Sequence, residues 1–220
     1  MSTACCELRL IEDNLRTGRS LALPADGINR VVYVAHGGIA VAGTSYGDDE
    51  AWHGRGAATI TAREHGAALW RWELAPTDST IAQASETDGA SRLKLACPLA
   101  SPIADQILMR ADSVSFPSGG CAFLHTHQGP GIRCLIDGGI RIDTEGHSTS
   151  YAPGGAWFEA GPSPVFAQGA ADRPSRFIRV MVLPASLKGK SSISYVRAED
   201  RDKPKSQSYK GYVDSVIEIA

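Results

Sequence analysis

The sequence has no long apolar run and no broad basic field, and residues 7–76 show no convincing amphipathic helical pattern. Its 220 residues include 22 Lys and Arg against 24 Asp and Glu, a net charge of -2. Without a long enough apolar run a helical membrane span is excluded, and the balanced charge argues against nucleic acid as a partner. The N-terminus has no basic start followed by an apolar run, so no secretory signal is indicated and a cytoplasmic location is expected.

Cysteine pairs with metal-ligand spacing are missing, and so are two common catalytic motifs. The five cysteines are odd in number and show no paired metal-ligand spacing, so reduced thiols are expected. The sequence contains no Gly-x-Ser-x-Gly elbow and no complete Gly-rich phosphate loop. Nucleophilic hydrolases are therefore set aside, and no nucleotide cofactor is expected.

What the sequence does contain is a succession of short strand patterns separated by turns. Residues 30–43, RVVYVAHGGIAVAG, have two β-rich runs around a Gly-Gly turn, which is a strong hairpin signal. Residues 77–90 are rich in Thr, Ser, Asp and Gln and indicate a surface connection. The polar stretch 185–220 carries a Lys-Pro-Lys run around Pro204 that disfavours a helix, so an extended tail is expected there, packed along the body or a neighbouring molecule.

Three segments of the first half reappear in the same order in the second half. VVYVAHGGIAVAG is similar to RCLIDGGIRIDTEG, AWHGRGAATITA to AWFEAGPSPVFA, and ALWRWELAP to RFIRVMVLP. Three matches in order indicate a duplicated all-β unit, and short strands with Gly/Pro turns at this size are typical of a small barrel or sandwich. The predicted organisation is an N-terminal unit over 1–76, a linker and connecting strand over 77–105, a C-terminal unit over 106–184 and the extended tail over 185–220.

The most informative stretch is residues 116–142, FPSGGCAFLHTHQGPGIRCLIDGGIRI. His125 and His127 lie two apart on an alternating strand pattern, so both imidazoles project from the same face of the pleat. Paired imidazoles on one face suit a divalent metal. The competing interpretation is two polar residues on a solvated sheet face.

This stretch resembles the first motif of the cupin family. In that motif a Gly is followed after five residues by His-x-His, after three or four more by Glu, and after six more by Gly. Gly119, His125, His127 and Gly138 match, whereas the Glu position falls on Gly131. The resemblance implies a small jelly-roll barrel with a metal ion in its mouth, and a metal motif that survives only in part.

The second cupin motif is weaker in this chain. Gly155 matches its first Gly, but the Pro, the second Gly and the final Asn are replaced, and Phe166 stands at the His position. The first half shows no metal motif at its equivalent positions. Taken over both halves, the resemblance implies an all-β chain of two tandem cupin-type jelly-roll barrels, a bicupin, with an extended C-terminal tail and a degenerate metal motif in the C-terminal barrel alone.

The resemblance also implies a divalent metal, Fe, Mn, Ni, Cu or Zn, on the His pair. Two imidazoles alone make a weak site, so a third donor is required. Cys121 shares the parity of the histidines if no bulge intervenes. Glu145, His147 and Glu159 lie near turns or strand ends, where the sequence does not fix their direction.

Two residues are predicted to bind substrate. Arg133 shares strand parity with Gly131, so its guanidinium is expected to face inward and bind a carboxylate or another oxyanion. The alternatives are an internal ion pair with Asp137 or Glu159, or a bulge that turns Arg133 to solvent. Phe166 at the lost His position would make the mouth more apolar, which suits a hydrophobic or aromatic ligand.

Two functions from different classes follow. The first is a metal-dependent, dioxygenase-like enzyme acting on a small anionic or aromatic substrate in the C-terminal barrel, with its catalytic residues unassigned. The alternative is a non-catalytic small-ligand-binding or scaffold bicupin that has lost its metal site. A small-molecule ligand is the expected partner. One chain could supply the pair of barrels by itself, while the tail after Pro184 could clasp a second copy, so a homodimer stays open.

Overall fold

The computed structural model describes residues 6–100 and 106–218. The chain divides into two compact units, unit 1 with residues 1–101 and 218–220, and unit 2 with residues 102–217. The predictions that fall on residues 1–5, 101–105 and 219–220 lie outside the described residues. The predicted bounds at residues 76, 105 and 184 stay a prediction.

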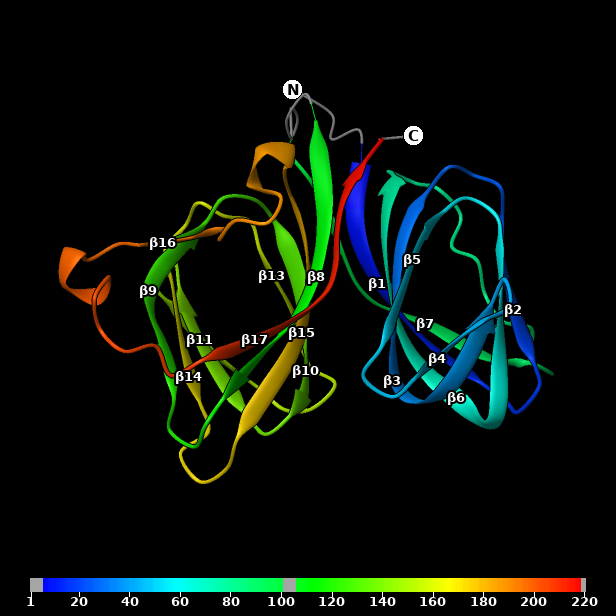
Figure 1. Ribbon diagram of the computed structural model, residues 1–220, viewed down its shortest axis with the longest axis horizontal. Helices are drawn as coiled ribbons and strands as arrows, with labels where there is room; N and C mark the ends of the chain where they lie inside the picture. Colours follow the sequence, from blue (N-terminus) through cyan, green and yellow to red (C-terminus); the bar gives the residue numbers. More distant parts are fainter. Residues whose placement is uncertain (1–5, 101–105, 219–220) are drawn as a thin grey trace. The chain divides into compact units, whose positions relative to one another are not determined.

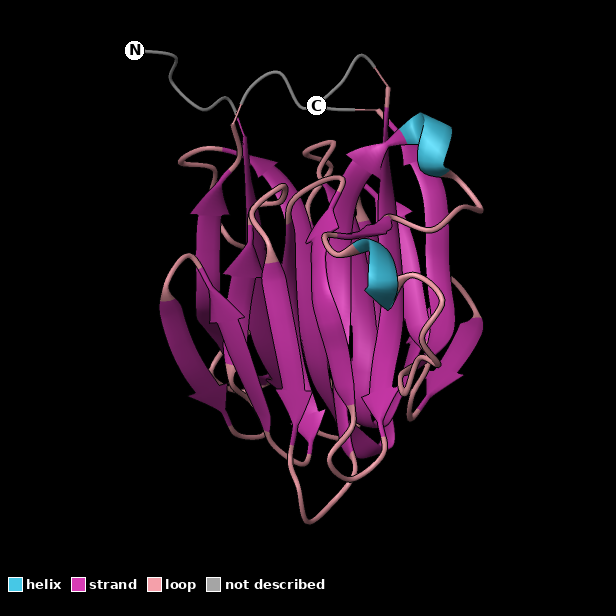
Figure 2. Cartoon of the chain, turned by 90° about the vertical axis from the view of Figure 1, so that its left-hand side faces the viewer, coloured by secondary structure: helices cyan, strands magenta, loops and turns pink. Residues whose placement is uncertain are grey.

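Strands account for nearly all of the regular structure (Figure 2). Within the described ranges the helices are two 3-10 turns, η1 (Ala185–Leu187) and η2 (Ala198–Asp200). No helix in this part of the chain is long and apolar enough to cross a membrane. The prediction of an all-β chain is confirmed, and the count of two barrels stays a prediction.

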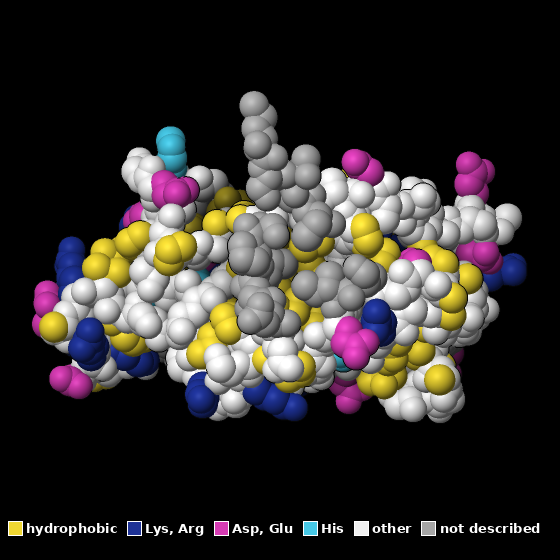
Figure 3. Space-filling view, turned by 90° about the horizontal axis from the view of Figure 1, so that it is seen from above, with side chains coloured by type: hydrophobic (Ala, Val, Ile, Leu, Met, Phe, Trp, Pro, Cys, Tyr) yellow, Lys and Arg dark blue, Asp and Glu magenta, His cyan; other side chains and the backbone are white. Residues whose placement is uncertain are grey.

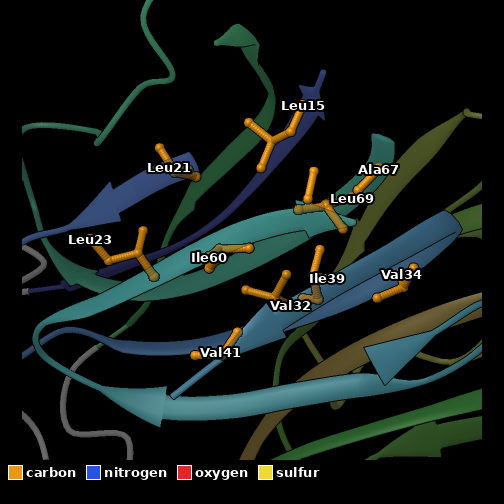
Figure 4. Close-up of a cluster of buried hydrophobic side chains, with 11 residues drawn as sticks. Leu15, Leu21, Leu23, Val32, Val34, Ile39, Val41, Ile60, Ala67 and Leu69 are labelled. Carbon is orange, nitrogen blue, oxygen red and sulfur yellow. The ribbon is translucent and has the colours of Figure 1, made fainter. Parts of the chain in front are cut away.

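Unit 1 is built on one antiparallel seven-stranded sheet. Five strands follow the order β4-β3-β6-β1-β7, while β2 pairs with β6 and β5 pairs with β3. The strands are β1 (Cys6–Leu15), β2 (Ser20–Leu23), β3 (Asn29–Val41), β4 (Thr44–Gly47), β5 (Ala51–Arg55), β6 (Ala58–Pro76) and β7 (Gly89–Pro98). Figure 4 shows aliphatic side chains of β1, β2, β3 and β6, such as Leu15, Val32 and Leu69, pointing toward one another in a buried cluster.

Unit 2 contains two antiparallel five-stranded sheets, β13-β10-β15-β8-β17 and β12-β11-β14-β9-β16. The strands are β8 (Ile107–Phe116), β9 (Cys121–His127), β10 (Gly131–Asp137), β11 (Ile140–Thr144), β12 (His147–Tyr151), β13 (Ala156–Glu159), β14 (Val165–Gly169), β15 (Ser175–Pro184), β16 (Ile193–Tyr195) and β17 (Ser208–Ile217). In Figure 1, β8, β10 and β15 lie on one side of this unit and β9, β11 and β14 on the other. A buried apolar cluster that includes Phe116, Trp157 and Phe177 fills one end of the interior.

The two units share an order of strands, as the sequence repeat predicts. The order β5-β3-β6-β1-β7 in unit 1 corresponds to β13-β10-β15-β8-β17 in unit 2. The repeated segments occupy equivalent places, because ALWRWELAP ends β6 and RFIRVMVLP forms most of β15. Arg71 and Arg179, which the repeat aligns, each form a two-bonded ion pair with a carboxylate of the neighbouring strand, Asp13 and Asp112 respectively.

The connecting segment and the expected tail both contribute strands to the two units. β7 lies within the stretch predicted as a linker and connecting strand, and it pairs with β1 along its length, because its alternating Arg92-Leu93-Lys94-Leu95 pattern suits an edge strand. β16 and β17, from within the expected tail, pair with β9 and β8. The tail is extended, as predicted, and it completes both sheets of unit 2.

Charged side chains are placed differently on the surface and in the interior. On the face seen in Figure 3, basic and acidic side chains are interspersed. Inside unit 1, by contrast, Arg9, Arg30 and Arg71 are fully buried and all contact the Glu73 carboxylate. Buried charges persist only when they are paired and hydrogen-bonded, so this network fills the interior of unit 1 with satisfied groups.

Candidate functional site

The His pair lies on β9 and faces the interior of unit 2. His125 and His127 are 4% and 3% exposed. β9 pairs with β14 through Val165 opposite His125 and Ala122 opposite Ala167, so the register shifts between these two pairs. This bulge shifts the alternation upstream of the histidines and turns Ala122, not Cys121, inward. Cys121 therefore does not face the His pair, because its expected parity required an unbulged strand.

The two imidazoles are adjacent and neutral. Their Nε2 atoms are 3.2 Å apart, and His125 Nδ1 lies 2.7 Å from the carbonyl oxygen of Phe123. That contact makes Nδ1 the protonated nitrogen of His125 and leaves its Nε2 as an acceptor. Burial lowers the pKa of both rings, and that of His127 falls to about 3. Both side chains are thus in the protonation state that binds a metal.

Glu159 brings a carboxylate to the His pair from another strand. It ends β13 and pairs with Gly131 of β10, the position at which the cupin motif has its Glu. Its Oε1 accepts a hydrogen bond from Trp157 Nε1 at 2.8 Å, and its Oε2 lies 3.0 Å from His127 Nε2. The carboxylate missing from β10 is therefore supplied by its neighbour in the sheet.

Arg133 faces inward, as predicted, and its guanidinium lies against this carboxylate. Its Nη2 is 2.7 Å from Glu159 Oε2, and its Nη1 donates to the Gly131 carbonyl at 2.7 Å. The internal ion pair with Glu159, one of the alternatives left open by the sequence, is thus present. A Cβ on Gly131 would come within 2.7 Å of the Val180 carbonyl oxygen and 3.0 Å of Arg133 Nη1, so the β15 backbone leaves no room for a side chain at the position of the motif's Glu.

The charges of the site are strongly coupled. Burial alone would raise the pKa of Glu159, but the Arg133 cation and the adjacent His127 hold it well below its usual range. Burial lowers the pKa of Arg133 to about 10, with Glu159 opposing the shift. Close by, the buried Arg179 forms its ion pair with Asp112. At neutral pH the group therefore contains two cations, two carboxylates and two neutral imidazoles.

Three buried atoms at the site lack aligned hydrogen-bond partners. Among the described residues, Glu159 Oε2, Arg133 Nη2 and His127 Nδ1 make no hydrogen bond, although the first two are close to each other. Such groups are costly to bury and call for an explanation. Beside them is a space of about 20 Å³, enough for one water-sized group.

The other predicted site residues lie elsewhere. Glu145 and His147 are exposed at the β11–β12 turn. Phe166 is half-buried and paired with Asp143, whereas its neighbours Val165 and Ala167 face the core. The expectation that Phe166 lines the mouth is therefore wrong, because the inward positions of β14 are the odd-numbered ones.

Sequence reasoning missed the Arg179–Asp112 pair. Both residues line the small space beside the His pair or the cavity next to it. A signal was present in the repeat, since ALWRWELAP and RFIRVMVLP both carry an arginine at the same place. A buried arginine repeated in two sheets requires a carboxylate partner nearby.

The chemical types of the donor groups at the site suit a divalent metal. Two neutral imidazoles and one carboxylate are the ligand set of non-haem Fe(II) centres, and they also suit Mn(II) or Zn(II). Bonds of about 2.1 Å at right angles place neighbouring donors about 3 Å apart, which is close to the 3.2 Å and 3.0 Å separations found here. As the described side chains stand, no group of three or more His, Cys, Asp or Glu is arranged so that it could hold a metal ion, and the Arg133 guanidinium lies against the Glu159 carboxylate.

Comparison with known proteins identifies the fold. A scan of protein-family models gives no match, and a search of curated proteins gives none either. Among solved structures, a deletion variant of Bacillus subtilis oxalate decarboxylase superposes with a TM-score of 0.64 and 14% identity, over 86% of this chain and 71% of that chain. A structure used to assign the Mn(II) centres of the same enzyme gives 0.64 and 13% over the same shares. The chain therefore has a cupin fold.

Proposed function

We propose that unit 2 is a metal-dependent enzyme of the cupin type that acts on a small anionic substrate. The observation that carries the proposal is the position of Glu159. Its Oε2 atom makes no hydrogen bond within the described residues and lies 3.0 Å from His127 Nε2. The fold likeness to an enzyme with Mn(II) centres adds support. His125, His127 and Glu159 would hold the ion, and a bound divalent metal supplies a Lewis acid that polarises a substrate carbonyl or carboxylate, or a centre that binds dioxygen.

The residues around the ion would set which substrates enter. The interior is neutral without a metal, because Arg133 and Arg179 balance Glu159 and Asp112. A divalent ion adds two positive charges to a buried site, so an anionic substrate is favoured over a neutral one. Arg133 keeps Glu159 ionised, and Trp157 fixes the direction of its Oε1. Apolar neighbours such as Val165 line the small space beside these charges.

The test is metal analysis of the untagged, full-length protein. We expect about one divalent ion per chain, most simply identified by elemental analysis and, for Mn(II), by its EPR spectrum. The His125→Ala/His127→Ala variant and Glu159→Gln should lose it. His147→Ala is the matched control, because that histidine is exposed in the same unit, and it should keep the metal.

Wild-type protein that is free of metal and does not bind added Mn(II), Fe(II) or Zn(II) would refute the proposal and leave a non-catalytic binding protein. If metal is present, small carboxylates, oxalate among them, and phenols are the compounds to assay for carbon dioxide release and oxygen uptake.

A further inference from the structure

A second, larger cavity of about 570 Å³ lies in unit 2 beside the His site. Its volume is typical of small-ligand pockets and exceeds what a two-carbon acid would fill. Its walls come from β8, β15 and β17 and from residues 189–195 and 205–207. Most of the lining therefore belongs to the C-terminal stretch that the sequence predicted as a tail.

The cavity adjoins the His site directly. Arg179, Ile193 and Tyr209 line both the cavity and the small space next to the histidines. β16 pairs with β9 so that Tyr195 lies opposite His125, and their ring centroids are 6.5 Å apart. A ligand bound in the cavity would thus have one end next to the imidazoles.

The charge of the lining is positive. The lining contains four cationic side chains and two carboxylates. Both carboxylates form ion pairs with arginines, Asp112 with Arg179 and Asp214 with Arg110. The cations left over are Lys190 and Lys205. This excess favours an anion in the cavity.

Lys205 is the better placed of the two lysines. Its ammonium donates to the carbonyl oxygens of Asp200 and Arg201 and lies 4.0 Å from the centroid of the Tyr195 ring. These contacts hold the ammonium in place at the wall of the cavity, so its positive charge is fixed next to a bound ligand. Lys190, by contrast, is exposed on a loop and would lose more side-chain entropy on binding.

Besides the charged groups and the polar Ser191, Ser192 and Gln207, the lining is aromatic and apolar. Tyr209 accepts a hydrogen bond from the buried Gln207 Nε2 at 3.1 Å, and the same amide is a neighbour of the Tyr195 hydroxyl. The two phenol rings stand with Ile193 and Val213 around the cavity. Aromatic rings with a few fixed donors are the usual surroundings of a planar organic ligand.

We propose that this cavity binds an aromatic carboxylate, with its ring between Tyr195 and Tyr209 and its carboxylate on Lys205. Turnover of such a ligand at the His site rests on the proposed function, whereas binding in the cavity does not. The cavity contacts are made by side chains of the chain itself, so the anion should bind with or without a metal.

The test is calorimetric titration of the full-length protein with 4-hydroxybenzoate and with its neutral analogue 4-hydroxybenzamide. The carboxylate should bind the wild type and the His125→Ala/His127→Ala variant alike, and the amide about tenfold more weakly, since a hydrogen bond to a charged group is worth about one decade or more. Lys205→Met should weaken the binding of 4-hydroxybenzoate by a similar factor. Lys210→Met is the matched control, because Lys210 lies on β17 outside the lining, and it should change nothing.

The outcomes separate the two proposals. Absence of 4-hydroxybenzoate binding to the wild type, equal binding of acid and amide, or an unchanged affinity in Lys205→Met would overturn the cavity assignment. Loss of 4-hydroxybenzoate binding in the His125→Ala/His127→Ala variant would place the anion on the metal, and this result would also overturn the cavity assignment. Binding that persists in a wild-type protein found to contain no metal would support the cavity while refuting the metal-dependent enzyme. The acid and amide comparison needs only the wild type, so it stands even if Lys205→Met does not fold.

Discussion

The buried pair Arg133–Glu159 gives the sharpest prediction about the site. Both side chains are buried, at 1% and 7% exposure, and each is the other's nearest opposite charge. Glu159→Gln keeps the acceptor for Trp157 but leaves the Arg133 cation without its counter-ion. Breaking a buried pair from one side costs about 3–5 kcal/mol, whereas replacing both members by neutral groups is close to neutral. We therefore expect chelator-treated Glu159→Gln to lose about that much stability, and Arg133→Met/Glu159→Gln to recover most of it.

Differential scanning calorimetry is the appropriate assay, because a chain of two units can show two transitions and the change should appear in only one. Glu145→Gln, an exposed carboxylate of the same unit, should stay within about 0.5 kcal/mol of the wild type. Metal content should behave differently from stability: both variants with glutamine at 159 should lose the ion, and Arg133→Met should keep it. A double variant as unstable as Glu159→Gln alone would refute the reasoning.

Two further predictions concern the same interior. Gly131→Ala places a Cβ 2.7 Å from the β15 backbone and should destabilise unit 2 by about 1–3 kcal/mol; in calorimetry Gly139→Ala, with no contact closer than 3.7 Å, should not. Burial holds the pKa of His127 at about 3, against 6.5 in a free chain, so between these values only the unfolded state takes up the proton. Stability of the chelator-treated protein should therefore fall by about 2 kcal/mol for this residue from about pH 7 to about pH 5. His127→Gln should remove that share of the slope in urea titrations, and an unchanged slope would contradict a neutral, buried ring.

The strand content and the repeat could be predicted from the sequence because both rest on local patterns. Alternation and Gly turns identify strands one at a time, and the ordered matches between the halves correspond to a shared strand order. The His pair was found for the same reason, since two residues on one strand have a fixed relation. β17 was harder, because an edge strand rich in polar residues looks like a tail.

The rest of the site depends on pairing between strands, which local patterns do not contain. Glu159 could be named only as one of several candidates, because its partner Gly131 lies 28 positions away on another strand. One extra residue in β9 reversed the parity of Cys121, and the alternation of β14 placed Phe166 away from the interior. Parity arguments hold only within an unbulged strand.

The two units show why a reaction is to be sought in unit 2 rather than unit 1. Both carry a buried arginine at the same repeat position, and each pairs it with an aspartate. In unit 1 the neighbouring cations all reach Glu73, and the Arg9 and Arg71 guanidinium groups also donate to carbonyl oxygens of residues 79–82. In unit 2 the buried Arg133–Glu159 ion pair instead lies beside His127, with a space of about 20 Å³ next to it. The carbonyl oxygens and cations that surround Glu73 in unit 1 are thus replaced in unit 2 by a pair of imidazoles, which is the reason to look for a ligand in unit 2.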